Sequence, residues 1–267
     1  MQDRAEEKDY ILKKLSDFAR ERVDMAKRKV PSEEIRKRAY ELPKGTFAFE
    51  KALKNPGVSF ICECKKASPS KGVIAPDFPY IQIAKDYEAA GADCISVLTE
   101  PKWFLGRDQY LKEIAEQVKI PCLRKDFTVD EYMIYEAKLL GASAILLICS
   151  LLTEREIKKY LEICEELGLS ALVEVHDERE IERALRAGSR VIGVNNRNLK
   201  DFTVDTSNSK RLRGQVPEDI LFVAESGIRC AKDVADLYQI GVDAVLVGET
   251  LMRTGNKKEK LKELRGE

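Results

Sequence analysis

The chain has 267 residues, of which 44% are hydrophobic and 34% are charged. This length suits one large domain that can bury a core without disulfide or metal support. Lysine and arginine together number 46, and aspartate and glutamate also number 46. The resulting zero net charge argues against a nucleic-acid partner held by bulk positive charge, so an anionic ligand must be bound by local groups.

Apolar runs and cysteines indicate the compartment. The longest apolar run, residues 142–152, is too short to span a bilayer, so no membrane partner is expected. Residues 1–8 are largely charged and lack the apolar region of a signal peptide. The seven cysteines form no Cys-x-x-Cys pair, and we expect free buried thiols in a reducing cytoplasm.

The chain contains one histidine, His176. A zinc site would therefore depend on cysteine or carboxylate ligands, and those present lack ligand spacing, so no metal is expected. A Ser-His-Asp or Cys-His device is possible only around His176. Acid–base chemistry must then fall largely to glutamate, aspartate and lysine.

The first 45 residues are predicted to form a helical extension. Leu12, Leu15 and Phe18 recur at helical spacing among charged residues. Pro31, followed by two glutamates, is typical of a helix that starts again with an acidic first turn.

From residue 59 onward, short apolar runs alternate with amphipathic helical stretches, which predicts parallel strands joined by right-handed crossovers. The predicted strands are 60–64, 94–98, 121–124, 144–149, 171–175, 191–194, 221–224 and 244–247. The predicted helices between them are 81–90, 110–118, 130–140, 154–167, 178–187 and 231–240.

Several predicted helices end in a repeated glycine phrase, at Gly91, Gly141, Gly188 and Gly241, about every 50 residues. Glycine after a helix adopts the left-handed conformation that ends it before the next strand. Eight strand–helix units favour a closed barrel over an open doubly wound sheet, and no Gly-x-Gly-x-x-Gly motif follows an early strand. We expect an α/β fold: one domain, residues 1–267, forming a (β/α)8 TIM barrel whose N-terminal helical extension caps the barrel mouth.

Long polar side chains stand where five of the predicted strands end, and active sites of such barrels lie at the C-terminal ends of the strands. Residues two apart on a strand face the same way, so Glu63 should lie beside Lys65 and Asn195 beside Arg197. If these strand ends were only the solvated edge of the barrel, short polar residues should be as frequent there as long charged ones. The frequency of long charged residues therefore favours a site. The side chains concerned are Glu63, Lys65, Lys125, Glu174, Asn195, Arg197, Glu225 and Ser226.

Two glycine turns suggest a phosphate site. Ser226-Gly227 follows the seventh predicted strand, and Gly248-Glu249 follows the eighth and opens a helix-like segment. Backbone N–H groups at such turns bind phosphate without a net positive chain, and barrels often use the loops after strands seven and eight. The segment 66–72, which contains Ser68, adds hydroxyls and amines.

Apolar residues near the same strand ends are candidates for holding a flat ring. Trp103 and Phe104 follow the second strand, and Phe127 lies just past Lys125. Leu146 belongs to the fourth strand and Leu199 follows the sixth.

Taken together, these phrases resemble the indole-3-glycerol phosphate synthases, from about residue 45 to residue 252. Cys62, Cys64 and Asn198 depart from the usual residues of that family, at positions outside the catalytic motifs. The segments that carry the resemblance are 63–72, 96–100, 123–127, 172–176, 193–199, 224–228 and 247–252.

The resemblance implies a cofactor-free, decarboxylating ring closure of 1-(2-carboxyphenylamino)-1-deoxyribulose 5-phosphate to indole-3-glycerol phosphate. It implies Lys125 as general acid, Glu174 as the group that moves a proton in dehydration, and Lys65 as the holder of the substrate carboxylate and a second candidate acid. The sequence does not decide which lysine donates the proton at which step. Glu63 and Glu225 would tune the lysines. The remaining implied contacts are Asn195 and Arg197 to substrate oxygens, Ser68, Ser226, Gly227, Gly248 and Glu249 to phosphate, and Pro69, Phe104, Phe127, Leu146 and Leu199 to the ring.

Two other functions fit parts of the pattern. A Schiff-base aldolase would use Lys125 or Lys65 as nucleophile. A phosphosugar-binding sensor would keep the phosphate site but would not need paired acids and bases. In each case the partner is a phosphorylated small molecule. The oligomeric state is not readable from the sequence, and we favour a monomer.

Overall fold

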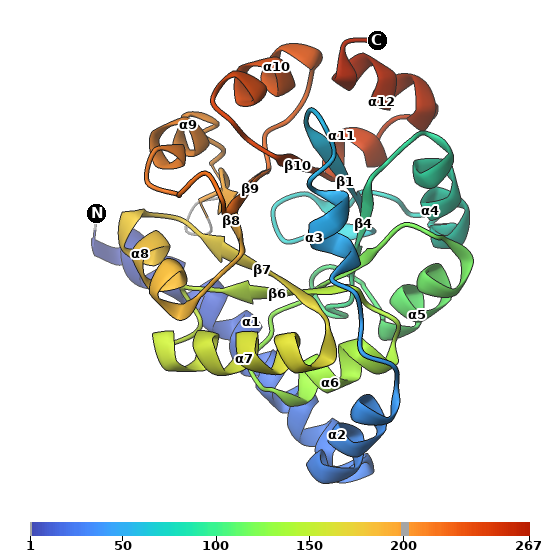
Figure 1. The fold of residues 1–267 in the computed structure, drawn as a ribbon, viewed down its shortest axis with the longest axis vertical. Helices are drawn as coiled ribbons and strands as arrows, with labels where there is room; N and C mark the ends of the chain where they lie inside the picture. The colour runs from blue at the N-terminus through green and yellow to red at the C-terminus, as the bar shows by residue number, and fades with distance from the viewer. Residues whose placement is uncertain (1, 199–202) are drawn as a thin grey trace.

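Parallel strands close into a barrel, as the alternating pattern predicts. A computed structural model describes residues 2–198 and 203–267, with side chains from residue 11 onward. Within these residues, β1 pairs with both β4 and β10, which closes the ring (Figure 1). The barrel strands are β1 (Ser59–Cys64), β4 (Cys94–Leu98), β5 (Cys122–Lys125), β6 (Ala144–Ile148), β7 (Ser170–Val175), β8 (Val191–Asn195), β9 (Leu221–Glu225) and β10 (Ala244–Val247).

Helices follow the strands around the outside of the barrel (Figure 1). Gly91, Gly141, Gly188 and Gly241 all have φ between 77° and 92°, which confirms the predicted left-handed helix ends. The predicted helices are present to within two residues at each end, as α4 (Tyr80–Ala89), α5 (Asp108–Gln117), α6 (Tyr132–Leu139), α7 (Glu154–Leu167), α8 (Glu178–Ala187) and α10 (Ala231–Gln239).

The sequence pattern missed several short elements, because a segment of two to nine residues carries too little periodicity to be recognised. After β1 the chain forms a small antiparallel hairpin of β2 (Ala67–Ser68) and β3 (Gly72–Val73). The helices that were not predicted are α3 (Ala48–Ala52), α9 (Ser207–Arg213) and α12 (Lys257–Arg265), whereas α11 (Glu249–Met252) is the expected helical turn after Gly248.

One of these elements, α3, closes the N-terminal end of the barrel. Its Phe49 and Leu53 are fully buried and join the inward-facing cluster that includes Ile61, Leu123 and Leu172. Burying each such side chain stabilises the fold by about 1.5–3 kcal/mol. Figure 1 shows α3 in front of the barrel and α1 behind it. With one end plugged, the C-terminal ends of the strands form the accessible mouth.

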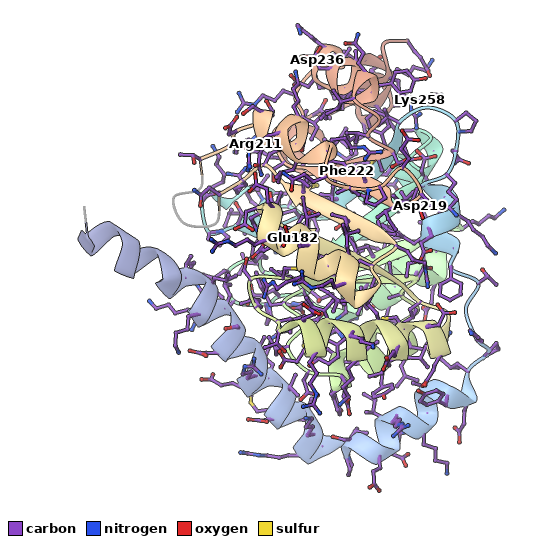
Figure 2. All side chains as sticks on the ribbon, turned by 60° about the vertical axis from the view of Figure 1, so that its left-hand side comes forward. Glu182, Arg211, Asp219, Phe222, Asp236 and Lys258 are labelled. Atoms are coloured by element: carbon purple, nitrogen blue, oxygen red, sulfur yellow. The ribbon has the colours of Figure 1, made fainter. Side chains whose placement is uncertain are left out.

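The N-terminal extension is helical but not continuous. It comprises α1 (Gln2–Lys29) and α2 (Ser32–Glu41), with the break at Pro31, where the sequence predicts a restart. Residues 42–47, which we expected to be helical up to residue 45, are not helical. The α2 helix packs against α6, and α1 runs along one side of the body (Figure 2).

A buried ion pair fixes α1 to the barrel. Both terminal nitrogens of Arg22 donate to the carboxylate of Asp126, at 3.1 and 2.6 Å, and the Asp126 side chain is fully buried. Burial would raise the pKa of Asp126, but Arg22, Arg124 and a hydrogen bond from Thr99 outweigh it and lower the pKa. Asp126 follows Lys125 directly, so the extension is tied to a strand end at the mouth.

Replacing Arg22 with leucine should lower the free energy of unfolding by about 3–5 kcal/mol, because Asp126 would remain charged and buried without its main partner. Urea unfolding at neutral pH measures this. The matched control is Lys13→Ala, which removes an exposed ion pair with Asp17 and should change stability by less than about 0.5 kcal/mol. Equal effects of the two variants would contradict the assignment of Arg22 and Asp126 as a buried ion pair that stabilises the fold.

A single unfolding transition in the same urea experiment would support the prediction that the chain forms one domain.

The cysteines are free, and one of them corrects the prediction of buried thiols. Burial raises the pKa of Cys122 to about 12, so this thiol is inert at neutral pH. Cys230 is exposed, because it precedes α10 at the helix N-cap and does not lie in the apolar face of that helix.

None of the helices in the described part of the chain combines the length and the apolar character of a membrane-spanning segment.

Candidate active site

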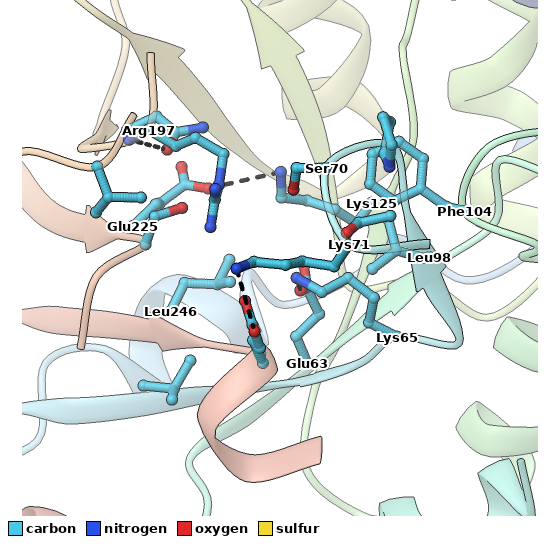
Figure 3. Close-up of a pocket in the computed structure, with 18 of the residues that line it drawn as sticks. Glu63, Lys65, Ser70, Lys71, Leu98, Phe104, Lys125, Arg197, Glu225 and Leu246 are labelled. Atoms are coloured by element: carbon cyan, nitrogen blue, oxygen red, sulfur yellow. Dashed lines mark hydrogen bonds and ion pairs between the residues drawn. The ribbon is translucent and has the colours of Figure 1, made fainter. Parts of the chain in front are cut away.

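A pocket of about 740 Å³ opens at the C-terminal ends of the barrel strands. Figure 3 shows Lys65, Lys71 and Lys125 reaching into it. Of the predicted site residues, two are not found in this pocket: Trp103, whose ring packs against Phe18 on α1, and Leu199, which lies outside the described residues. The predicted residues found there are Glu63, Lys65, Ser68, Pro69, Phe104, Lys125, Phe127, Leu146, Glu174, Asn195, Arg197, Glu225, Ser226, Gly227, Gly248 and Glu249.

Lys125 lies between two carboxylates from different strands. Its Nζ is 3.4 Å from Oε2 of Glu174, on β7, and 3.6 Å from Oε2 of Glu225, on β9. Both carboxylate side chains are 2% exposed. These distances are longer than a tight charged hydrogen bond, so the amine is close enough to be held but is not saturated.

The neighbouring carboxylates stabilise the protonated form of the Lys125 amine. Burial alone would lower the pKa of the amine, but the negative charges of Glu174, Glu225 and Glu63 outweigh it and raise the pKa. Lys125 is therefore protonated throughout the neutral range. This suits a group that donates a proton and does not suit a nucleophile, which must be neutral.

Glu63 and Lys65 form a second pair on the opposite wall, where β1 ends. Nζ of Lys65 donates to Oε2 of Glu63, and both side chains line the pocket. The expectation that these two residues share a face is therefore confirmed. Gly248 fits closely over the pair, because a Cβ there would lie 2.3 Å from Oε2 of Glu63 and 2.8 Å from Nζ of Lys65. A side chain at residue 248 would thus displace the pair.

Glu225 is held in an environment that favours its protonated form. Burial and the charges of Glu174 and Glu63 outweigh the attraction of Lys125 and raise the pKa of Glu225 to about 7. Its Oε1 is buried and accepts no hydrogen bond. Gly193 leaves room for this oxygen, since a Cβ at that position would approach it to 2.3 Å.

We expect Glu225→Gln to stabilise the protein at about pH 8. The folded state holds a proton on Glu225 up to about pH 7, whereas an unfolded glutamate loses it near pH 4.5. The carboxyl therefore costs folding nothing below about pH 4.5, and the cost grows to about 3 kcal/mol as pH rises through 7. Unfolding in urea at about pH 5 and pH 8 measures the gain, which should fall to less than about 1 kcal/mol at the lower pH. A variant that is less stable at pH 8 would contradict the raised pKa.

Asn195 ends β8, Arg197 lies two residues later, and both line the pocket, as predicted. Oδ1 of Asn195 accepts the backbone N–H of Arg197 at 3.0 Å, which fixes the turn that carries the arginine. Arg197 also forms an isolated bridge with Val204. The pair therefore presents an amide and a guanidinium from one short, internally bonded segment.

Two turns form a corner of the pocket beside these groups. Ser226 and Gly227 have φ of 67° and 88°, and a non-glycine residue such as Ser226 adopts a positive φ only uncommonly. Glu249 begins α11, and Nε of Arg253 donates to its carboxylate at 2.9 Å. Lys71 lies 3.9 Å from the same carboxylate. These two cations, together with backbone N–H groups, make the corner suited to an anion.

An apolar wall lies across the pocket from that corner. The rings of Phe104 and Phe127 are 6.1 Å apart between centroids, at 45°. The Phe104 loop is anchored by Glu100, a fully buried carboxylate that accepts the backbone N–H groups of residues 102–104 at 2.8–2.9 Å. At this separation the two rings pack against each other, and together they present an apolar surface on which a flat ring can lie.

Sequence reasoning missed the contribution of α1 to the pocket. Ile11, Leu12 and Leu15 line it, about 110 residues before Lys125 in the chain. Their apolar spacing was visible, but nothing local indicates which surface a helix will cover. These residues add apolar surface at the mouth, which agrees with the expectation that the extension caps the barrel.

A family model described as indole-3-glycerol phosphate synthase matches residues 12–264. This chain belongs to the indole-3-glycerol phosphate synthase family. A relative of that name from Ruminiclostridium cellulolyticum is 58% identical over 257 residues, which cover 96% of this chain and 99% of the relative. Another of that name, from Endomicrobium trichonymphae, is 51% identical over 256 residues, covering 96% and 99%. The resemblance found in the sequence is thereby confirmed.

Solved structures outside the indole-3-glycerol phosphate synthase family share the fold. The 3-hexulose-6-phosphate synthase of Salmonella typhimurium superposes with a TM-score of 0.64 at 14% identity, covering 78% of this chain and 97% of that one. The phosphoribosylanthranilate isomerase of Thermotoga maritima gives 0.55 at 17% identity, covering 79% and 100%. At such identities the likeness supports the barrel and no particular chemistry.

Proposed function

We propose that this chain converts 1-(2-carboxyphenylamino)-1-deoxyribulose 5-phosphate to indole-3-glycerol phosphate, carbon dioxide and water, a step in tryptophan biosynthesis. The observation that carries the proposal is the position of Lys125, 3.4 Å from Glu174, between an anion corner and an aromatic wall. The substrate has a phosphate, a benzoate ring and a ketone between them. Its three parts correspond to these three features.

The two ends of the substrate bind to different walls. Ser68 and the backbone amides of Ser226, Gly227, Gly248 and Glu249 bind the phosphate. The ring lies against Phe104 and Phe127, with Leu146 and Pro69 beside them. Holding both ends brings the carboxylate-bearing ring carbon toward the ketone, and positioning of this kind lowers the barrier substantially. Asn195 and Arg197 bind substrate oxygens between the two ends.

Ring closure is an attack of that ring carbon on the ketone carbon. Lys125 donates a proton to the ketone oxygen, which would otherwise carry a full negative charge. The attack leaves the ring nitrogen as an iminium. Lys65 holds the substrate carboxylate until the carbon–carbon bond breaks, and the electron pair released with carbon dioxide neutralises the iminium.

Dehydration completes the pyrrole ring. The hydroxyl made from the ketone leaves as water after it takes a second proton from Lys125, which has first regained a proton from solvent. Glu174 takes the carbon-bound proton whose electron pair forms the new double bond. Glu225 and Glu63 tune the lysines and favour the return of a proton to Lys125 between these steps. The iminium is the electron sink, so the balance of the reaction needs no further group.

Chelation should therefore leave the rate unchanged. Among residues 11–198 and 203–267, no group of three or more histidine, cysteine, aspartate or glutamate side chains is arranged to hold a metal ion. Turnover is measured before and after dialysis against excess EDTA. A loss of activity that magnesium or zinc restores would contradict the mechanism.

Mixing the protein with the carboxyphenylamino-deoxyribulose phosphate tests the proposed function directly. Indole fluorescence should rise, and one carbon dioxide should be released for each indole formed. Tight binding without turnover would instead indicate a sensor. Borohydride trapping of a covalent adduct with a ketose phosphate would indicate an aldolase, which the raised pKa of Lys125 argues against.

The proposal includes a cytoplasmic monomer. Free thiols at all seven cysteines fit a reducing compartment. The large hydrophobic side chains that are exposed in the described part of the chain are scattered over several elements and form no obvious subunit interface. They are Met25, Tyr40, Leu42, Val73, Leu105 and Tyr238.

A further inference from the structure

The chain's one histidine lies directly behind Glu174. His176 follows β7 by one residue, and its Nε2 is 3.4 Å from Oε1 of Glu174. The other oxygen of that carboxylate, Oε2, is the one near Lys125. Glu174 is thus placed between an amine that faces the pocket and an imidazole that does not line it.

Hydrogen bonds on the far side of the ring fix the position of one proton. Nδ1 of His176 is 3.2 Å from Oε2 of Glu180, which also accepts the backbone N–H of His176 at 2.8 Å. Oε1 of Glu180 accepts the hydroxyl of Ser150 at 2.6 Å. Glu180 itself is held at the start of α8, where its N–H donates to Asp177. Because Glu180 only accepts, Nδ1 carries a hydrogen.

The near side of the ring is unsatisfied. Nε2 of His176 is buried and makes no hydrogen bond. If the ring is neutral and Glu174 is ionised, a lone pair and a carboxylate face one another across 3.4 Å. The contact becomes favourable when a single proton sits on either group, because one of them then donates to the other.

We propose that the facing atoms of Glu174 and His176 share a single proton, which is absent when dehydration begins: Glu174 takes it from the substrate and His176 then removes it from Glu174. In this step the O–H bond of Glu174 breaks and an N–H bond forms at Nε2, giving a carboxylate and an imidazolium. The imidazolium returns to the neutral ring by releasing a proton to water from the exposed part of its side chain, which is 20% exposed in all, although Nε2 itself is buried. The inference rests on the proposed function, in which Glu174 is the proton acceptor of dehydration.

The charges around the ring support an imidazolium that forms readily. Burial alone would lower the pKa of His176, but the hydrogen bond to Glu180 and the charges of Glu174, Glu180 and Glu225 outweigh it and raise the pKa. The cations nearby bind the carboxylates rather than the ring: Arg183 lies 3.7 Å from Glu180, and Lys125 lies on the far oxygen of Glu174. His176 is thus a positioning and proton-carrying residue that acts through Glu174.

Nuclear magnetic resonance tests the shared proton without any substrate, because a chain with one histidine gives one imidazole titration. In the wild-type protein that titration should lie above pH 6.5, and in Glu174→Gln it should fall by about one pH unit. A titration that Glu174→Gln leaves within about 0.2 units of wild type would overturn the proposal. This result is independent of whether the proposed reaction occurs.

Kinetics test the proton transfer. His176→Gln keeps a polar side chain that cannot take up a proton. We therefore expect kcat to fall at least about tenfold, with KM changed less than about twofold. In His176→Ala, added imidazole should restore part of the rate. The matched control is Asn208→Ala, which removes 3.5 Å contacts to the backbone carbonyls of His176 and Asn195 and a hydrogen bond from Arg211 but does not touch the imidazole ring. This control should keep the rate and show no imidazole effect.

The outcomes separate the two proposals. Wild-type kcat and pH profile in His176→Gln would overturn the role of His176 and leave the ring closure standing. Full turnover in Glu174→Gln would instead remove the proton acceptor from the proposed function, and the role of His176 with it. A third outcome is that His176→Ala loses turnover, imidazole restores none of it, and Asn208→Ala behaves as wild type. This outcome would count against His176 as the residue that carries the proton.

Discussion

Replacing Lys125 with alanine should lower kcat by about 10²–10⁴-fold, because a positioned general acid contributes that much to a reaction. The loss should appear in kcat more than in KM, since the ketone oxygen gains negative charge only as the ring closes. Steady-state indole fluorescence measures it. The matched control is Lys258→Ala, an exposed lysine on α12, which should retain the wild-type rate.

The same variant has a second effect that separates chemistry from folding. Without Lys125, the carboxylates of Glu174 and Glu225 lose the cation between them, so the pKa of Glu225 should rise further. The variant should therefore be least stable at high pH and recover at about pH 5. A rate within about tenfold of wild type, in a folded variant, would remove Lys125 from the acid role.

Glu174→Gln should separate decarboxylation from product formation. Glutamine fills the same volume but cannot accept the proton that dehydration releases, so indole formation should slow by about 10²–10⁴-fold. Ring closure and loss of carbon dioxide do not use this carboxylate in our account, and they should slow less. In a single turnover, carbon dioxide should appear well before indole fluorescence.

The order of release is the critical observation for this variant. If carbon dioxide and indole are delayed together, Glu174 acts at or before ring closure, and its assignment to dehydration is wrong. Glu180→Gln is a useful control, because it keeps an acceptor for His176 and does not touch the pocket. It should change the pH profile while leaving the order of release unchanged.

The site could be predicted from the sequence because, in a closed parallel barrel, residues at the ends of different strands lie close together. Glu63, Lys125, Glu174 and Glu225 lie far apart in the chain, but each comes at or near the end of a parallel strand. Once eight alternating units indicate a closed barrel, those ends must meet at one mouth. The predicted group therefore required only the periodicity of the strands and the residues at their ends.

Contacts that depend on packing were not predictable in this way. The closeness of Gly193 to the carboxylate of Glu225 depends on the register between β8 and β9, where these residues lie on neighbouring strands. The pair of Arg22 and Asp126 joins segments 104 residues apart and has no local signal. The α3 plug was missed because five residues cannot show a helical period.

The role of His176 illustrates the same limit. Its uniqueness was evident from composition, and its nearness to Glu174 in the chain was visible. Adjacent side chains on a strand face opposite sides and residues two apart face the same side, which suggests contact with the same surroundings. The orientation of its ring, however, is determined by Glu180 on α8 and by Ser150 after β6, and only the fold brings those together.

A crystal structure of the Lys125→Ala variant with the unreacted carboxyphenylamino-deoxyribulose phosphate would show how the substrate lies, because this variant should bind the substrate without turning it over. We expect the phosphate at the turns of Ser226 and Gly248, the ring against Phe104 and Phe127, and the ketone oxygen beside the space left by the amine. A substrate bound in the reverse direction, or with its ketone far from Glu174, would contradict the proposed mechanism.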